Sequence, residues 1–260
     1  MPYNSITGQL IRESPILFKA EEFIRPADTT TYAAGDSVAI AQRVIDAAAG
    51  TPIVCQTTAP HLLTTDDRVF IAAVGGNTNA NGIRKVTVLT STTFALYDDV
   101  TGAAIATNSA YTSGGTVQRL PRFTEVVPAN GGTGSIVALQ LWVRNPTVTA
   151  GTFRVRFYNA PIAAIADNAA QTVLAANRTL HQGYVDLTIL TIDGAGGDSS
   201  AVVGLLAQPL PFACSALRRD LFPVVTALGA FVPASGDIFR LTATIRRDQV
   251  PALASVAMSS

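Results

Sequence analysis

The sequence predicts an all-β protein, built as a two-sheet sandwich that carries a small inserted β-module. Three observations lead to this prediction. Apolar and polar residues alternate over short stretches, which is the period of a strand with one face in a core. Turns rich in glycine and proline separate these stretches. Convincing amphipathic helices do not alternate with them, so two packed sheets are favoured over an α/β arrangement.

The composition of the 260-residue chain excludes partners that are bound through bulk charge. Its 18 basic and 18 acidic side chains balance, so direct binding of nucleic acid is not expected. Only 14% of the residues are charged and 48% are hydrophobic, which is apolar for the surface of a monomer. We therefore expect part of the surface to contact another protein. No apolar run approaches about 18 residues, so we expect neither a membrane-spanning helix nor a secretory leader.

The strands of the sandwich are expected on both sides of the inserted module. Residues 1–49 should supply the first strand or two, although residues 37–49 also fit a helix of about three turns that is capped by Asp36 or Ser37. Later strand-length runs lie at residues 135–143, 152–158, 184–192 and 237–246. In the second and fourth of these runs, arginines alternate with apolar residues and should face away from the core. Residues 162–176 are alanine-rich but only weakly amphipathic, so they are a poor candidate helix.

A change of composition marks the inserted module at residues 50–118, which makes residues 1–49 and 119–260 one discontinuous domain. Short strand candidates lie at residues 53–57, 68–73, 83–89, 93–97 and 115–118, joined by turns such as Gly75-Gly76-Asn77. These are enough for a small barrel or a curled sheet. A segment this short buries only about 60% of its unfolded surface, so we expect the host domain or a neighbouring chain to support it.

Several motifs of the outer domain resemble those of tailed-bacteriophage structural proteins. The most specific is FIRPADTTTYAAGDSV at residues 23–38. The resemblance continues in three later motifs: NGGTGSI at 130–136, QPLPF at 208–212 and FVPASGD at 231–237. Together they resemble capsid cement, or decoration, proteins, which implies a jelly-roll fold. The resemblance implies a noncatalytic structural virion protein, commonly a homotrimer, that binds the phage major capsid protein. Its place would be the capsid exterior, after assembly in the host cytoplasm.

The inserted module resembles a second recurrent piece of phage virion proteins. The motifs are HLLTTDDRV at residues 61–69, GGNTNANG at 75–82, TTFALY at 92–97 and YTSGGTV at 111–117. This piece is itself similar to a barrel subdomain of ubiquitin-activating enzymes. The resemblance implies no activation chemistry, because Cys55 has no paired base nearby in the sequence and nucleotide-binding motifs are missing. If the outer domain contacts the capsid, the module is expected to project as a knob or to touch an adjacent trimer.

The candidate site residues are Arg25, Pro26, Asp28, Tyr32 and Asp36 of the first motif, as a structural turn or a capsid contact. Pro26 fixes its own φ and favours an extended Arg25. Asp28 and the threonines after it can close a local turn, across which Arg25 and Asp28 can pair; Asp36 belongs to a second turn. A turn clamp is favoured over a direct bond between Arg25 and a capsid carboxylate.

The sequence shows no pattern typical of catalysis, so we expect no enzyme, no metal and no cofactor. His61 and His181 lack the spacing of a metal pair, and no Gly-x-Ser-x-Gly elbow accompanies them. Cys55 and Cys214 are expected to be buried free thiols. The acidic residues Asp193 and Asp198 flank a glycine-rich loop that matches a calcium loop poorly, and a solvated loop is favoured.

An alternative from a different class is a tail, baseplate or fibre-associated module that binds host carbohydrate. Tyr32, Tyr97, Tyr111 and Trp142 are the aromatic residues that such a surface would use. Trp142 shares its alternation with Ile136, which favours a core or sheet-interface position over a sugar platform.

Overall fold

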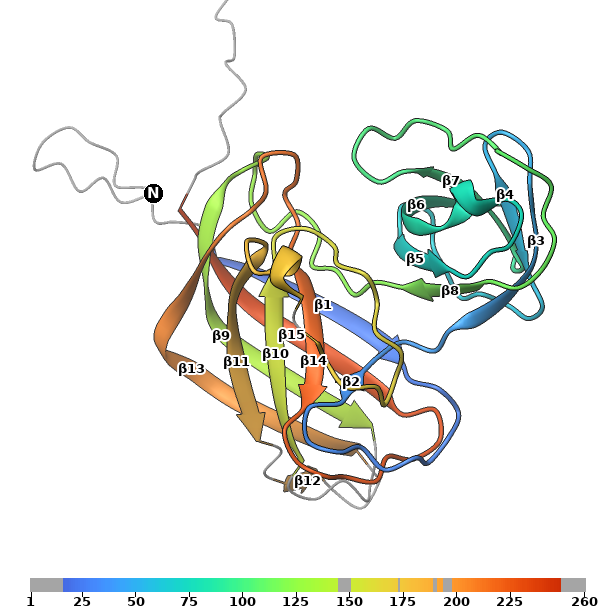
Figure 1. The fold of residues 1–260 in the computed structure, drawn as a ribbon. Helices are drawn as coiled ribbons and strands as arrows, with labels where there is room; N and C mark the ends of the chain where they lie inside the picture. The colour runs from blue at the N-terminus through green and yellow to red at the C-terminus, as the bar shows by residue number, and fades with distance from the viewer. Residues whose placement is uncertain (1–15, 145–150, 173, 189–190, 194–197, 249–260) are drawn as a thin grey trace, which may run out of the picture.

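The computed structural model describes residues 16–144, 151–172, 174–188, 191–193 and 198–248, and these form an all-β molecule in two parts (Figure 1). A sandwich of two sheets holds most of these residues, and a closed barrel lies beside it. The described ranges contain two helices, the single 3-10 turns η1 (Thr78–Ala80) and η2 (Ala175–Asn177). The predicted fold class, a β-sandwich with an inserted barrel-like module, is confirmed.

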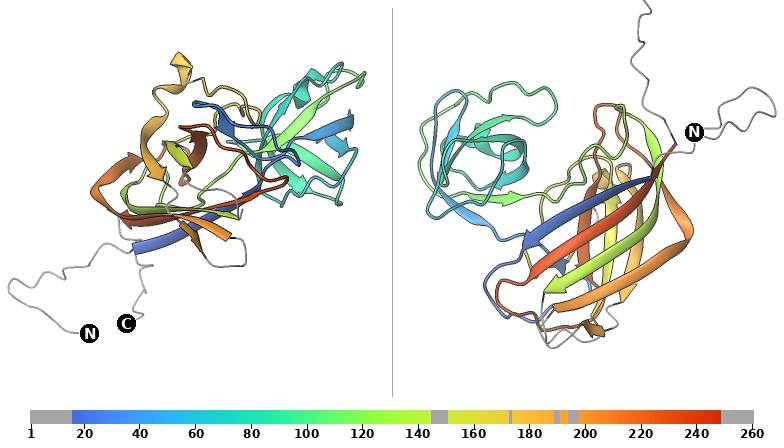
Figure 2. Two further views of the ribbon diagram at one scale, coloured as in Figure 1. Left: turned by 90° about the horizontal axis from the view of Figure 1, so that it is seen from below. Right: turned by 180° about the vertical axis from the view of Figure 1, so that it is seen from behind.

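The sandwich consists of a five-stranded and a four-stranded antiparallel sheet. The first sheet has the strand order β1 (Ile16–Ile24), β15 (Ile238–Arg247), β9 (Thr133–Arg144), β13 (Asp198–Ala213) and β12 (Thr191–Asp193). The second has the order β11 (His181–Thr188), β10 (Thr152–Tyr158), β14 (Phe222–Ala227) and β2 (Ser37–Val38). The right-hand view of Figure 2 faces the first sheet, with β1 along its edge.

The pairing of these strands is that of a jelly roll. When the short strand β12 is set aside, eight sandwich strands remain in chain order: β1, β2, β9, β10, β11, β13, β14 and β15. The first pairs with the eighth, the second with the seventh, the third with the sixth and the fourth with the fifth. This nested pairing is one long antiparallel hairpin rolled into two sheets, which is the jelly-roll arrangement.

Alternation along the strands places one apolar face of each sheet in the core. Phe153, Val155 and Phe157 of β10 are buried, and so are alternate residues of β15 from Phe239 to Ile245. The arginines between them face outward, as the period of the sequence predicts. The sandwich core is therefore built from the inner faces of both sheets.

The inserted module is a closed six-stranded barrel that lies between β2 and β9 in the chain. Its strand order is β3 (Arg43–Ala49), β4 (Val54–Thr57), β7 (Thr93–Asp98), β6 (Gly82–Val88), β5 (Arg68–Ala72) and β8 (Thr116–Arg119). The pairing of Arg43 with Val117 closes the barrel by joining its first strand to its last. A second hydrophobic core, which includes Ile45, Cys55 and Phe94, fills it. The barrel lies beside the sandwich, near β1 and β2 (Figures 1 and 2).

Two expectations for the chain around the barrel are corrected. Residues 37–49 do not form a helix but the strands β2 and β3, because Ser37 and Val38 extend the second sheet and Ile45 and Ala48 face the barrel core. The predicted module start at residue 50 therefore omits β3, one of the strands that close the barrel. The division into a discontinuous domain and an inserted module that its host supports stays a prediction.

The other candidate segments differ from their predictions in smaller ways. The described part of residues 162–176 has no α-helix and ends in η2. The strand expected at 184–192 corresponds to β11 and β12, which are separate strands. Residues 194–197 of the candidate calcium loop lie outside the described residues, as do residues 1–15 and 249–260 of the predicted outer domain.

Candidate functional site

Arg25 follows β1 with 1% of its surface exposed, and this chain satisfies every donor of its guanidinium. The Nε atom donates to the Tyr32 hydroxyl at 3.0 Å. One terminal nitrogen donates to the backbone carbonyls of Asp28 and Ala234. The other donates to the carboxylates of Asp28 and Asp167, at 2.9 and 3.0 Å. A guanidinium has five N–H groups, so these five bonds leave none for an external carboxylate.

Asp167 completes this cluster from the segment between β10 and β11. Its carboxylate accepts hydrogen bonds from the Tyr32 hydroxyl at 2.6 Å and from the Ala39 amide at 2.8 Å. Burial, together with the bond to Asp167, raises the pKa of Tyr32 well above its usual value, so the phenol stays a neutral donor. The Tyr32 ring also stacks on Phe231, with centroids 4.6 Å apart. These contacts tie together the β1–β2, β10–β11 and β14–β15 connections. We call Arg25, Asp28, Tyr32 and Asp167 the loop clamp.

The other predicted site residues lie in the turns around this clamp. The Asp28 carboxylate accepts a hydrogen bond from the Thr30 amide at 3.0 Å, which closes the local turn expected from the sequence. The Pro26 carbonyl accepts from the Asp28 amide at 2.9 Å, and the Asp36 carboxylate from the Ala33 amide at 2.6 Å. The motif therefore has the geometry of a structural turn, and a capsid contact through the Arg25 guanidinium would require the loop clamp to open.

The four aromatic residues considered for a sugar surface are divided between two parts of the molecule, with Tyr97 and Tyr111 in the barrel and Tyr32 and Trp142 in the sandwich. Tyr32 is fully buried in the loop clamp. Trp142 is half-buried on the outer face of the first sheet, whereas Leu139, Leu141 and Val143 fill the core. The expected core position of Trp142 is not observed, because the register of β9 shifts just after Ile136. Such a shift changes which face every later side chain occupies.

The histidines lie in different parts of the molecule and serve packing. In the barrel, the His61 Nδ1 accepts a hydrogen bond from the Leu63 amide at 2.9 Å, and its Nε2 lies 3.0 Å from the Thr90 carbonyl, to which it must donate. His181 begins β11 and lies edge-on to Tyr158. Burial lowers the pKa of His181, and Arg156 lowers it further. Within the described part of the chain, no group of three His, Cys, Asp or Glu residues is placed to hold a metal ion.

Cys55 and Cys214 are free and buried, as expected, and they lie in different cores. Cys55 belongs to the barrel core and Cys214 to the sandwich core. Burial raises the pKa of each thiol to about 12. Both therefore stay protonated and unreactive at neutral pH while the protein is folded.

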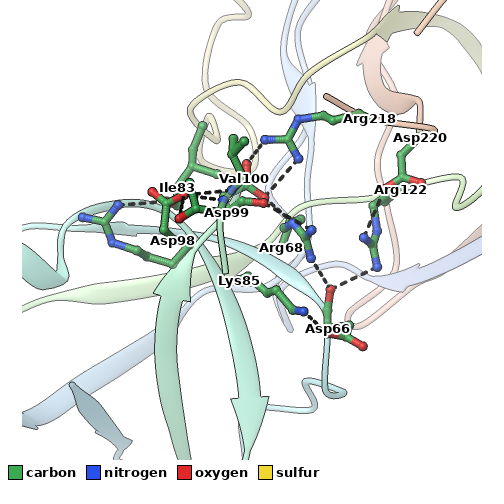
Figure 3. Close-up of polar contacts among 12 residues, drawn as sticks. Asp66, Arg68, Ile83, Lys85, Asp98, Asp99, Val100, Arg122, Arg218 and Asp220 are labelled. Atoms are coloured by element: carbon green, nitrogen blue, oxygen red, sulfur yellow. Dashed lines mark hydrogen bonds and ion pairs between the residues drawn. The ribbon is translucent and has the colours of Figure 1, made fainter. Parts of the chain in front are cut away.

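A cluster of charged side chains joins the barrel to the sandwich, and the sequence did not reveal it (Figure 3). Its centre is Asp99, which follows β7 and contacts both Arg68 of β5 and Arg218 of the β13–β14 connection. The two terminal nitrogens of Arg218 each donate to one Asp99 oxygen, one of them at 3.2 Å. The side chains of Asp99 and Arg218 are only 9% and 8% exposed, so the contact is a buried, bidentate ion pair.

Further charges surround this pair on both sides. Arg122 donates to the Asp66 carbonyl at 3.0 Å and pairs with Asp220 at 3.2 Å, while Lys85 pairs with Asp66 at 2.6 Å. A cavity of about 350 Å³ lies among these side chains. Burial lowers the pKa of Arg68, and Asp99 opposes this shift. We call the set the interdomain junction: Asp66, Arg68, Lys85, Asp99, Arg122, Arg218 and Asp220.

A second contact attaches the barrel to β1. Arg119, the last residue of β8, pairs with the Glu21 carboxylate and donates to the Glu22 carbonyl at 2.6 Å. The interdomain junction and this contact lie at different places on the sandwich, one at the β13–β14 connection and one at β1. The barrel is therefore held against its host domain by side chains as well as by its two chain connections.

Exposed apolar side chains gather on the outer face of β1. Ile16, Phe18 and Ile24 expose 62%, 71% and 42% of their surface. The three residues are separated by even numbers of positions, so their side chains lie on one face of the strand. Arg240 and Arg246 of the neighbouring strand β15 are exposed on the same face, with Arg246 directly opposite Ile16. We call these five residues the outer patch; clustered exposure of this kind is typical of a protein interaction site.

Comparisons with models of known protein families and with curated proteins find no match to this chain. Among the described residues, no helix has the length and apolar character that crossing a membrane requires.

Proposed function

We propose that this chain is a noncatalytic structural virion protein that binds the outer surface of a phage capsid and bridges subunits of its major capsid protein. The observation that carries the proposal is the outer patch, where large apolar side chains and arginines lie exposed together. Such residues are characteristic of protein interfaces. The jelly roll is a fold that viral coat proteins use. The resemblance of residues 23–38 to capsid cement proteins supports the capsid as the partner.

In this proposal the protein acts by binding alone, as a homotrimer on the capsid exterior that is assembled in the host cytoplasm and needs no cofactor. The loop clamp and the interdomain junction hold its surface in one shape, so little ordering is required on binding. A trimer engages several capsid subunits at once, and its later contacts are then intramolecular. Because it binds the intact shell and not separated subunits, it shifts the equilibrium against disassembly.

The test is to add the purified protein back to capsids that lack it. We expect trimeric protein to saturate the capsid surface and to raise the temperature at which the shells come apart, measured by calorimetry and electron microscopy. An unrelated protein of similar mass is the control. Full occupancy without any gain in heat resistance would contradict cementing. Labelling on tails instead of heads would contradict the location and favour the host-binding alternative.

A further inference from the structure

β1 is the edge strand of the five-stranded sheet, with β15 on one side and no described strand on the other. Hydrogen bonds show which of its backbone groups face the open side. The carbonyl of Glu22 accepts from the Arg119 side chain, and the carbonyl of Ile24 accepts from the Ala41 amide at 3.1 Å; neither donor belongs to β15. This chain thus already covers the C-terminal half of the open edge.

No residue in the described part of the chain covers the N-terminal half of the edge. Backbone direction alternates along a strand, so the N–H and C=O groups of Phe18 and Ala20 face the same open side as those of Glu22 and Ile24. No other described residue bonds to the backbone of Phe18 or Ala20 on that side. An unpaired edge beside exposed apolar side chains is a template for the addition of another strand. Natural proteins normally protect such edges against pairing.

The charges beside this edge indicate what kind of segment it accepts. Arg240 and Arg246 are exposed next to β1, and neither has an ion-pair partner among the described residues. Glu22 lies opposite Arg240 in the register without pairing with it. A second copy joined edge to edge would bring two such basic faces together on one sheet, which is unfavourable. An acidic segment of a different chain complements them.

We propose that the edge of β1 from Ile16 to Ala20 receives an extended, acidic segment of another coat protein, which adds to the sheet as a further strand. Apolar residues at alternate positions of that segment contact Ile16 and Phe18, and its carboxylates pair with the arginines of the outer patch. A groove of about 310 Å³ between β1 and the barrel, lined in part by Ile24 and the exposed Leu62, lies at the other, covered end of β1 and is not part of the proposed docking edge. This inference rests on the proposed function, since the partner is a capsid component.

Substitutions on the edge separate backbone pairing from side-chain contacts. Ala20→Pro removes an N–H that faces the open side, which an edge strand tolerates, and Ala20→Ser keeps that N–H. Phe18→Ser removes the most exposed side chain of the outer patch, which is 71% exposed. Leu217→Ser, in the β13–β14 connection, changes another large apolar side chain that is 62% exposed and is its control. We expect Ala20→Pro and Phe18→Ser to weaken binding to capsids that lack the protein by about tenfold or more, and both controls to bind as the wild type does.

Two further measurements test charge and occupancy. Arg240→Glu should weaken capsid binding more than Arg178→Glu, which changes an exposed arginine near η2. Hydrogen exchange should show that the amides of Phe18 and Ala20 become protected when the protein binds capsids.

The outcomes distinguish this inference from the function on which it rests. Failure of the wild type to bind capsids overturns the proposed function. Normal capsid binding by Ala20→Pro and Phe18→Ser, or unprotected amides at residues 18 and 20 in the bound state, overturns the docking edge and leaves cementing intact. A smaller mass of Ala20→Pro in solution than of the wild type identifies a second copy as the occupant, which also overturns the inference.

Discussion

Glu21 is a carboxyl group whose protonation is linked to folding. Its side chain is 12% exposed and pairs with Arg119 where the barrel meets β1. Burial raises the pKa of Glu21 from 4.5 to about 7, although Arg119 opposes the shift. The folded protein therefore holds this proton more tightly than the unfolded chain does. The resulting stability is fully present below about pH 4.5 and is lost as the pH rises through about 7.

Glu21→Gln, which stays neutral, should lack this pH dependence. Relative to the variant, the wild type should lose about 2–3 kcal/mol of unfolding free energy between pH 4.5 and pH 7.5, as measured by urea denaturation at several pH values. The exposed neighbour Glu22→Gln is the control and should follow the wild type more closely. Parallel curves for the wild type and Glu21→Gln would show that Glu21 has an ordinary pKa in the folded protein.

At the residue scale, local pairs were predictable and distant ones were not. Arg25 and Asp28 are three positions apart on either side of a turn, so their ion pair follows from the spacing. Asp167 lies 142 positions beyond Arg25, in an alanine-rich stretch that carries no signal for a buried carboxylate. The pair of Asp99 with Arg218 spans 119 positions. Such contacts depend on how the sheets and the barrel fold together, which residue types alone do not specify.

At the scale of elements, the turn between β5 and β6 requires glycine for reasons of space. Gly76 has a φ of +74°, and a Cβ atom there would lie 2.0 Å from the Ala110 carbonyl oxygen. Gly102 has a similar φ of +71°, but a Cβ atom there would meet nothing within 4 Å. The two positions differ in crowding and share the backbone conformation that disfavours a side chain.

Alanine at each position should separate these two effects. Gly102→Ala should cost about 1–2 kcal/mol of stability, from the positive φ alone. Gly76→Ala should cost about 1–3 kcal/mol more, because the Ala110 carbonyl must move. Urea denaturation, followed through the exposure of Cys55 in the barrel core, measures both values. Equal losses would mean that the segment around residue 110 shifts freely.

Elements were predictable from sequence where their period is strict. β10 and β15 alternate cleanly, and both were found with the expected faces inward. The helix considered for residues 37–49 was wrong. Short side chains such as those of Ala47 and Ala48 favour a helix locally. Pairing of β3 with β4 and β8 overrides that preference. The outward position of Trp142 depends on a register shift in β9 that alternation cannot show.

At the scale of the whole molecule, buried charges couple two separate hydrophobic cores. Asp99 of the barrel is held by Arg218 of the sandwich, and removing the carboxylate would leave Arg68 and Arg218 buried together without it. Removing one partner of a buried pair typically costs about 3–5 kcal/mol. Each core also contains one protected thiol, Cys55 or Cys214, so the opening of each part can be followed separately in the unmodified protein.

Asp99→Ala should uncouple the barrel from the sandwich. We expect both thiols of the wild type to become reactive at the same urea concentration, and Cys55 of the variant to react at a lower concentration than Cys214. Mass spectrometry of labelled peptides measures this. In Asp99→Ala/Arg218→Ala, the loss of stability should be smaller than the sum of the two single losses.

The exposed pair of Arg154 and Asp186 supplies the control for this coupling. Arg154→Ala should lower the free energy of unfolding by less than about 1 kcal/mol. Both thiols of this variant should become reactive at the same urea concentration. Simultaneous exposure of both thiols in Asp99→Ala would show that the junction charges do not couple the cores.

The closure of the barrel by β3 and β8 also makes this position of the jelly roll a site where a different folded domain can be inserted. Because Arg43 lies opposite Val117, the chain leaves the sandwich and returns to it at nearly the same point. A folded unit whose own ends lie equally close can replace the barrel without reordering the eight strands around it. On a particle that carries this protein, an enzyme or antigen inserted in place of the barrel would be displayed in many regularly arranged copies.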